Sequence, residues 1–238
     1  MILSRVNSQL SVASKAKVFD QKHQSERAMF EYKLSVEAKE NGTFEANRIW
    51  LGLTSPYIAK ETVVWCPKQG LKKVEMHQPH LNESGSLAIS AKQGRADLSS
   101  QNTEYKQKSK TLNFSKRPCT LLSIPFEIVH HWDELSAGNV LYFDYTVLKV
   151  QAHTGVKLTM RDESEFKVVS VTPEKWFWRL LFGSTEYYFE GDAPKLTKIV
   201  GLLEPRDRNL RGKYVEYLGR AIFDRTVDFS MIKESNHV

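Results

Sequence analysis

The feature that most constrains the fold is a strict alternation of large apolar and polar side chains. Segment 30–36 carries Phe, Tyr, Leu and Val at every second position, and charged or polar residues between them. A period of two is typical of a half-buried β-strand. Asn41-Gly42 follows and favours a tight hairpin turn. Segment 44–51 alternates again, so the sequence predicts a β-hairpin over 30–51.

Strand signals of this kind recur along most of the chain. Apolar runs separated by turn residues predict strands over 58–65, 71–77, 87–92, 140–150, 156–161, 165–171, 185–190, 195–203 and 212–222. Segment 97–110 is polar, with three lysines on one face, and we expect an exposed edge strand or a loop. About ten short antiparallel strands indicate a mainly β fold, a curved sheet or half-open barrel.

Two segments carry helix punctuation instead. Segment 123–137 has a proline near its start and a glycine directly after it. In segment 172–183, Thr172 is a suitable N-cap, Pro173 takes the first helical position and a glycine ends the run. We expect two short helices, one of them packed against or plugging the concave face of the sheet.

The chain shows no internal repeat and no linker between strand-rich parts. Residues 1–27 are polar and are expected to be flexible or a short helix. Residues 28–228 are predicted to form a single β-rich domain, and 229–238 a C-terminal tail.

Composition limits the classes of partner. The 238 residues include 34 Lys and Arg and 28 Asp and Glu, a net charge of +6. Acidic residues are interleaved with the basic ones, which argues against nucleic acid as a partner. No apolar run is long enough for a transmembrane helix, and the N-terminus lacks the apolar centre of a secretory signal.

Residues that could carry chemistry are few. Cys66 and Cys119 could form one disulfide or remain two buried thiols. His77 and His80 are separated by a proline, which prevents helical alignment of two metal ligands. Nucleophile, dinucleotide and phosphate-loop motifs are absent. We therefore expect no catalytic residue, no metal site and no cofactor.

The order of segments resembles a known group. An opening strand Phe30-Glu-Tyr-Lys-Leu is followed by a helix ending in His130-His-Trp-Asp-Glu-Leu-Ser-Ala-Gly138, then by Val171-Thr-Pro-Glu-Lys-Trp-Phe-Trp-Arg-Leu-Leu-Phe182 and Ile199-Val-Gly-Leu-Leu203. This pattern, over about residues 30–222, is similar to uncharacterised bacterial β-rich proteins shaped like the half-open barrels of periplasmic lipoprotein carriers and lipid-handling proteins. The resemblance implies a periplasmic location if a leader was removed or the start is misassigned; otherwise the protein is cytoplasmic.

The most unusual segment is the helix predicted around 176–182, which is apolar on almost every side. Such a helix is buried as core, covers an apolar cavity as a lid, or lies in a membrane surface. The candidate ligand-binding residues are Trp176, Phe177, Trp178, Leu181 and Phe182 of this helix, with Tyr142 of a nearby strand.

A second candidate is basic. Arg206, Arg208 and Arg211 surround a predicted turn and could grip phosphate or carboxylate head groups. The same pattern is typical of a solvated hairpin.

Three functions remain open from the sequence. The first is a non-catalytic binding protein that carries or senses an apolar, lipid-like ligand in a half-open barrel. The second is a scaffold or assembly protein that binds a protein partner through a sheet edge and exposed aromatic residues. The third is an unrecognised enzyme acting on a lipid.

Overall fold

The fold consists of one large sheet that curls over a set of short helices. The computed structural model describes residues 11–20, 28–52, 58–90, 94–101, 104, 106–191, 193–208 and 214–234, without the side chains of 149, 181, 182, 204–208, 214–216 and 234. The strands are β1 (Ser11–Asp20), β2 (Phe30–Ala38), β3 (Phe44–Gly52), β4 (Ala59–Cys66), β5 (Gly70–Gln78), β6 (Glu83–Ser90), β7 (Arg95–Gln101), β8 (Gln107–Asn113), β9 (Arg117–Cys119), β10 (Leu141–Val147), β11 (Ala152–Glu163), β12 (Phe166–Pro173), β13 (Thr185–Glu190), β14 (Lys195–Arg208) and β15 (Tyr214–Asp228). The helices are η1 (Pro79–Leu81), α1 (Ile124–His130), α2 (Trp132–Ser136), η3 (Leu148–Val150), α3 (Trp176–Phe182) and α4 (Ser230–Glu234).

The strand order places both free edges at the middle of the chain. It runs β8-β7-β6-β5-β4-β3-β2-β1-β15-β14-β13-β12-β11-β10-β9. Each half of the chain is therefore a meander, and the halves join where β1 pairs with β15. Neighbouring strands are antiparallel except for β9 and β10, which are parallel. The sheet remains open between β8 and β9, as expected for a half-open barrel.

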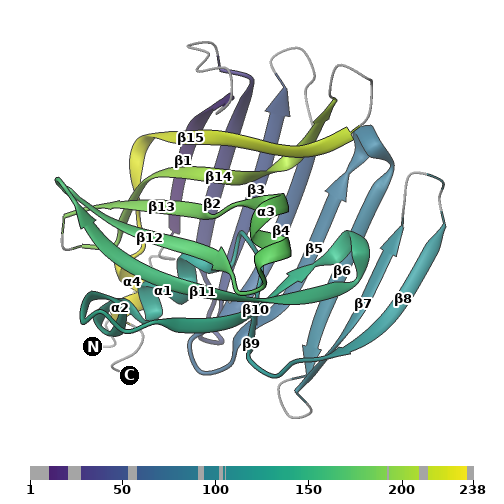
Figure 1. Ribbon diagram of the computed structural model, residues 1–238, viewed down its shortest axis with the longest axis horizontal. Coiled ribbons are helices and arrows are strands. Elements are labelled where there is room, and N and C mark those ends of the chain that lie inside the picture. Colours follow the sequence, from purple (N-terminus) through teal and green to yellow (C-terminus); the bar gives the residue numbers. More distant parts are fainter. Residues whose placement is uncertain are drawn as a thin grey trace, which may run out of the picture.

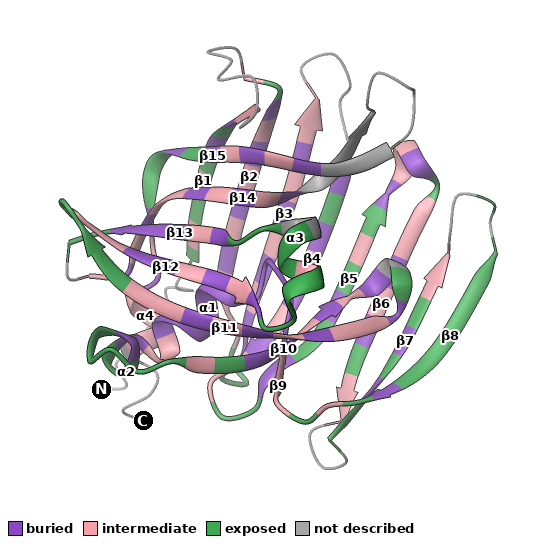
Figure 2. Ribbon diagram, in the orientation of Figure 1, coloured by how far each residue is buried: buried purple, intermediate pink, exposed green. Residues whose placement is uncertain are grey.

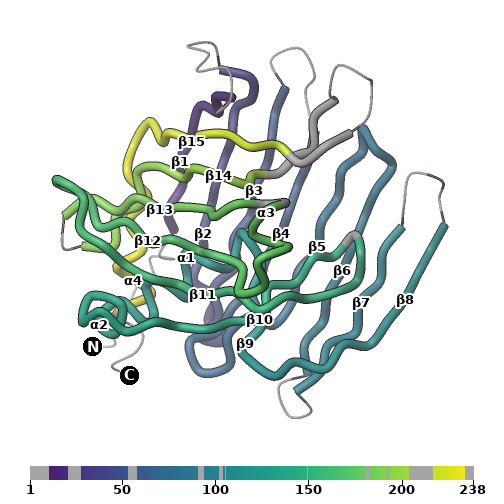
Figure 3. The backbone as a smooth tube through the Cα atoms, viewed as in Figure 1, coloured from purple at the N-terminus to yellow at the C-terminus, as the bar shows by residue number. Residues whose placement is uncertain are grey.

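The two halves form two crossing layers. Figure 1 shows β10 to β15 running roughly horizontally in front of β1 to β6, with β7 and β8 beyond them at the right and α1, α2 and α4 gathered at one end. The path of the tube in Figure 3 shows that the front layer returns to β1 through β15. The facing sides of both layers carry the buried aromatic and aliphatic residues, among them Trp50, Trp65, Tyr187 and Phe189. Packing of one layer on the other thus supplies the core.

The turn between β10 and β11 fastens the front layer to the rear one. The side chain of Leu148 in η3 lies over Gly85 of β6, where an added Cβ would come within 3.2 Å of the Leu148 Cβ. Beside it, Gln151 Nε2 donates to the Ser100 hydroxyl at 3.1 Å and to the backbone carbonyl of Lys108 at 2.8 Å. These contacts hold the front layer against β6 to β8, next to the open edge.

The sequence prediction of about ten strands is wrong in number, because the described residues alone form fifteen. Residues 11–20, expected to be flexible or helical, form β1, which pairs with both β2 and β15. Within the expected C-terminal tail, α4 packs into the core, with Phe229 and Ile232 buried. The strand β1 depends on pairing with β2 and β15, and α4 depends on packing against the core. The local sequence pattern therefore predicts neither. Segment 97–110 holds most of β7, which is paired on both sides, and the first four residues of the exposed edge strand β8, so the expected edge strand is confirmed only in its last part.

The prediction of two short helices is wrong in number, because the described residues form four α-helices and two 3-10 helices. Segment 123–137 is helical, split at His131 into α1 and α2. Segment 172–183 becomes helical only from Trp176, because Thr172 and Pro173 still belong to β12. The helix that fills the space between the layers is α1, whose Ile124, Phe126 and Ile128 are fully buried.

Candidate functional site

A cavity of about 100 Å³ lies between the front strands and the rear layer, below α3. Its walls are mostly apolar and come from both halves of the chain, including Met76, Leu148, Val156, Val171, Trp178 and Leu202. Strands β10 to β14 contribute one wall, and β3 to β6 contribute residues opposite. The cavity therefore depends on the crossing of the two layers.

One part of the cavity wall is charged. Arg48 of β3 and Glu61 of β4 are direct cross-strand neighbours, and Arg48 Nη2 donates to Glu61 Oε2. The Thr120 hydroxyl donates to Glu61 Oε1 at 3.4 Å. Both charged side chains are buried, so each compensates the other in a medium of low polarity. The cavity thus combines an apolar wall with a neutral, strongly polar patch.

Two buried tyrosines adjoin this ion pair. Burial raises the pKa of Tyr32 to about 12, against the opposing effect of the neighbouring Arg48 guanidinium. Burial likewise raises the pKa of Tyr187, whose hydroxyl donates to the Leu121 carbonyl at 3.1 Å. Both phenols stay protonated at neutral pH, which suits them to hydrogen bonding rather than to proton abstraction.

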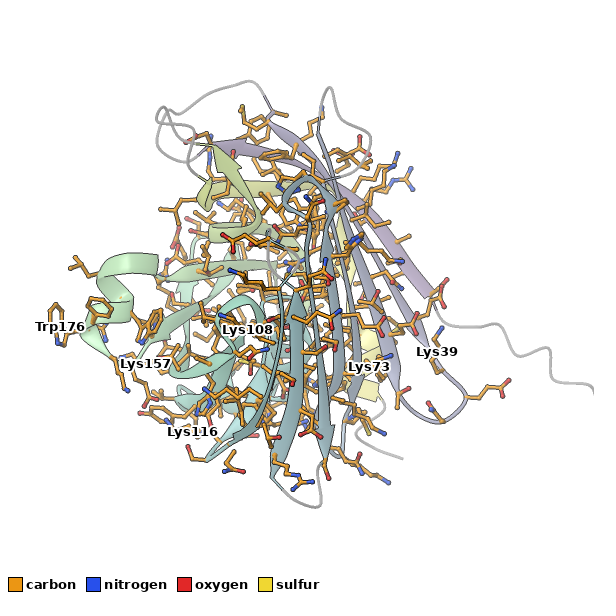
Figure 4. The ribbon with its side chains drawn as sticks, turned by 90° about the vertical axis from the view of Figure 1, so that its right-hand side faces the viewer. Lys39, Lys73, Lys108, Lys116, Lys157 and Trp176 are labelled. Carbon is orange, nitrogen blue, oxygen red and sulfur yellow. The ribbon has the colours of Figure 1, made fainter. Side chains whose placement is uncertain are left out.

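Helix α3 stands at the mouth of the cavity and divides its aromatic residues between two environments. Trp178 lines the cavity. Trp176, Phe177 and Leu180 point away from it, with exposed fractions of 73%, 52% and 75%. Figure 2 shows α3 as a mostly exposed element, and Figure 4 shows Trp176 projecting from the body of the molecule. Of the three alternatives that the sequence left open for this helix, burial as core does not fit these exposures.

The local sequence explains where α3 begins and ends. Lys175 is still extended, and Gly183 ends the helix at a φ of 65°, a conformation that favours glycine. The Gly183 amide donates to the Arg179 carbonyl at 2.9 Å, and the Arg179 guanidinium donates to the Pro173 carbonyl at 3.3 Å. The helix is thus a single compact projection from the end of β12.

Tyr142 lies on the surface rather than in the cavity. It is 51% exposed, and Lys116 Nζ lies 5.1 Å from its ring centroid. Its cross-strand partner is Lys157 of β11. Tyr142 therefore belongs to the outer face of the front layer and not to the cavity wall, and its role as a ligand contact stays a prediction.

The remaining predicted site residues lie partly beyond what the structure describes. The side chains of Leu181, Phe182, Arg206 and Arg208 are outside the described set, although their backbones belong to α3 and β14. Arg211 lies outside the described residues altogether. The role of these five as ligand contacts stays a prediction.

Sequence analysis missed Arg48 and Glu61, although a signal for both was present. Arg48 shares its alternation with Phe44, Ala46 and Trp50, so it points inward with them. Glu61 occupies an equivalent inward position in β4. Two opposite charges at buried positions of consecutive strands indicate a buried pair.

Metal-binding and redox candidates behave as ordinary side chains. Among the described residues, no group of three or more His, Cys, Asp or Glu could hold a metal ion. His80 instead bonds to the Ile58 carbonyl through Nδ1 at 2.8 Å. Cys66 and Cys119 are both free thiols, not a disulfide. None of the described helices is long and apolar enough to cross a membrane.

Comparison with known proteins supports the fold alone. A beta-barrel-like protein of domain of unknown function DUF1849 from Brucella abortus has a similar crystal structure. Its TM-score is 0.55 at 6% sequence identity, over 92% of this chain and 98% of that chain. No family model and no curated protein matches the sequence. The protein thus shares a β-barrel-like architecture with an uncharacterised bacterial group.

Proposed function

We propose that the protein is a non-catalytic binding protein that holds an apolar, lipid-like ligand between its two layers. The observation that carries the proposal is the cavity beneath α3, with its largely apolar wall and Trp178 at its mouth. Curled sheets of this kind commonly enclose one small ligand. Transfer of apolar surface from water, worth roughly 25 cal/mol per Å², would drive binding.

The cavity is smaller than a usual ligand site, so part of the protein must move to admit a ligand. Sites for small organic ligands usually measure about 300–1,000 Å³, whereas this one measures about 100 Å³. A ligand with an acyl chain therefore requires α3 to swing outward. The helix lies between extended Lys175 and Gly183, so backbone rotation at its two ends can carry Trp178 away from the cavity.

The Arg48–Glu61 pair favours a particular kind of polar group on the ligand. Because the pair is internally neutralised, it can offer hydrogen bonds without a net charge. This supports an amphiphilic ligand whose polar group is uncharged, or whose charge is stabilised by interaction with Arg48 or Glu61. The pair also weakens the enzymatic alternative, because each charged group is already engaged by the other.

The scaffold alternative receives less support from the sheet edge. Five of the seven residues of β8 form an exposed run that includes Lys108 and Lys110. Lysine on an edge strand opposes the addition of a further strand. The free edge at β8 is therefore poorly suited to pairing with a partner.

Titration of the full chain with cis-parinaric acid, a fluorescent fatty acid, tests the proposal. We expect a saturable fluorescence increase, weakened about tenfold or more in Trp178→Ala by the loss of apolar contact. Phe177→Ala is the matched control, since Phe177 is the neighbouring residue of α3 but faces solvent. Native mass spectrometry of the purified protein provides a second readout. Absence of uptake together with a clean unliganded mass would overturn the proposal.

A further inference from the structure

The outer face of α3 is an apolar surface of a kind that folded proteins rarely leave in water. Trp176, Phe177 and Leu180 are spaced so that all three lie on one side of the helix, and all are more than half exposed. Trp176 and Phe177 also contact each other edge to face, with ring centroids 6.2 Å apart. Large exposed apolar side chains that cluster on a projection mark an interaction site.

Basic residues surround this apolar projection. Lys175, directly before α3, and Arg179 of α3 are both exposed. Lys116 and Lys157 lie on the adjoining sheet surface, on the same side of the molecule as Trp176 (Figure 4). Contacts link these two lysines to the start of α3 and to each other. Lys116 pairs with Glu174, two residues before α3, at 2.5 Å. The Lys116 ammonium also lies over the ring of Tyr142, which is the cross-strand partner of Lys157.

We propose that this side of the molecule, centred on Trp176, Phe177 and Leu180 and flanked by Lys116, Lys157, Lys175 and Arg179, docks on an anionic lipid surface. Four cations stand against two carboxylates: that of Glu174, which Lys116 already engages, and that of the buried Asp144, which accepts from the Ser115 and Lys116 amides. Negatively charged head groups complement that excess, and aromatic side chains prefer the depth of the head groups and upper acyl chains. A soluble protein partner would be expected to offer a groove for the projection, whereas a bilayer accepts it without one.

This inference goes beyond the proposed ligand and does not depend on it. The two aspects meet at α3, because Trp178 of the same helix lines the cavity. Insertion of the outer face into lipid would pull α3 from the sheet and open the cavity toward the acyl chains. A bound surface would thereby supply or receive the ligand.

Co-sedimentation of the full chain with vesicles tests the docking. We expect binding to vesicles of phosphatidylglycerol and phosphatidylethanolamine, and much weaker binding to phosphatidylcholine alone. The double variant Trp176→Ser/Phe177→Ser should lose binding, while Ile222→Ser, which removes an exposed apolar residue of β15, should retain it. Wild-type binding that does not respond to the anionic lipid, or that survives in the double variant, would overturn the proposal.

A charge variant tests the electrostatic part. Lys157→Gln/Lys175→Gln should weaken vesicle binding roughly thirtyfold, since each basic residue near an anionic surface is worth about fivefold in affinity. Lys72→Gln/Lys73→Gln removes the same charge from β5, where Lys73 lies on the far side of the molecule from Trp176 (Figure 4). If both double variants lose the same vesicle affinity, net charge alone explains the binding. That result would refute a defined docking face.

Tryptophan emission gives a readout independent of sedimentation. Trp50, Trp65 and Trp132 are buried, so Trp176 is the indole best placed to leave water on docking. We expect a blue shift with anionic vesicles in wild type and its loss in Trp176→Phe, which should still sediment with them. Trp178→Ala should retain vesicle binding even if it loses fatty-acid uptake. Fatty-acid uptake therefore tests the ligand proposal and vesicle binding tests the docking proposal, so the failure of one is distinguishable from the failure of the other.

Discussion

The indole Nε1 of Trp65 donates a 2.7 Å hydrogen bond to Oε1 of Glu127, a carboxylate with no exposed surface. The other oxygen of Glu127 lies 3.1 Å from Arg117 Nε, and the Arg117 guanidinium lies over the Trp65 ring. These contacts tie α1 to β4 and to the edge strand β9. Burial raises the pKa of Glu127 above its usual value, and the charge of Arg117 only partly opposes this.

This pKa shift makes stability depend on pH in a defined direction. The folded protein keeps the Glu127 proton to a higher pH than the unfolded chain does. The free energy of unfolding should therefore decrease as pH rises from the unfolded pKa of 4.5 through the folded pKa, with a limiting slope of about 1.4 kcal/mol per pH unit. Glu127→Gln should remove that slope, because its amide oxygen can still accept from Trp65. Urea unfolding across this range measures it, with the exposed Glu163→Gln as the control that keeps the slope.

The glycine at position 201 permits a close approach in the front layer. Its φ is +123°, and an added Cβ would lie 2.5 Å from the backbone oxygen of Ser184. Gly201→Ala should destabilise the protein by about 3 kcal/mol or more, since the backbone itself must shift. Gly191→Ala is the matched control, with φ +62° and open space around the new methyl group; we expect a loss of about 1–2 kcal/mol there. Denaturant unfolding measures both variants. Equal losses of unfolding free energy in the two would contradict a close backbone approach at Gly201.

The local parts of this fold could be predicted from sequence, and the non-local parts could not. The hairpin of β2 and β3 follows from alternation and the Asn41-Gly42 turn, both contained within a few residues. In β1, only Ala16 and Val18 are fully buried, so its pattern is weak and pairing on both sides makes it a strand.

The candidate site, like the fold, could be predicted only in its local parts. An apolar helix over 176–182 was predictable, but composition does not distinguish a core helix from a projection at a cavity mouth. In the structure, β12 continues through Pro173, so the helix begins only after the chain has left the sheet. The charged cavity wall could have been found, because Arg48 and Glu61 interrupt two otherwise apolar inward series.

The two cysteines should differ sharply in reactivity. Cys119 is fully buried, and burial raises the pKa of its thiol well above the usual value. Cys66 is partly exposed. A thiol reagent such as 5,5′-dithiobis(2-nitrobenzoic acid) should therefore modify Cys66 in the native protein and Cys119 only on unfolding. Cys66→Ser should abolish the fast reaction. A reaction that requires prior reduction would show a disulfide and contradict the free thiols.

The stability of the protein should respond to Phe229, directly before its C-terminal helix α4, and not to the outer face of α3. Phe229 is 1% exposed, and its ring packs edge to face on Phe126 of α1 at 5.8 Å. Phe229→Ala should lower the free energy of unfolding by about 3–5 kcal/mol, from lost burial and the cavity left behind. Trp176→Ala removes a larger side chain, yet it should change stability by only about 0.5 kcal/mol, because that indole is already in water. Denaturant unfolding of both variants measures the contrast. A large loss in Trp176→Ala would mean that α3 is core, and it would remove the basis for both the lid and the docking face.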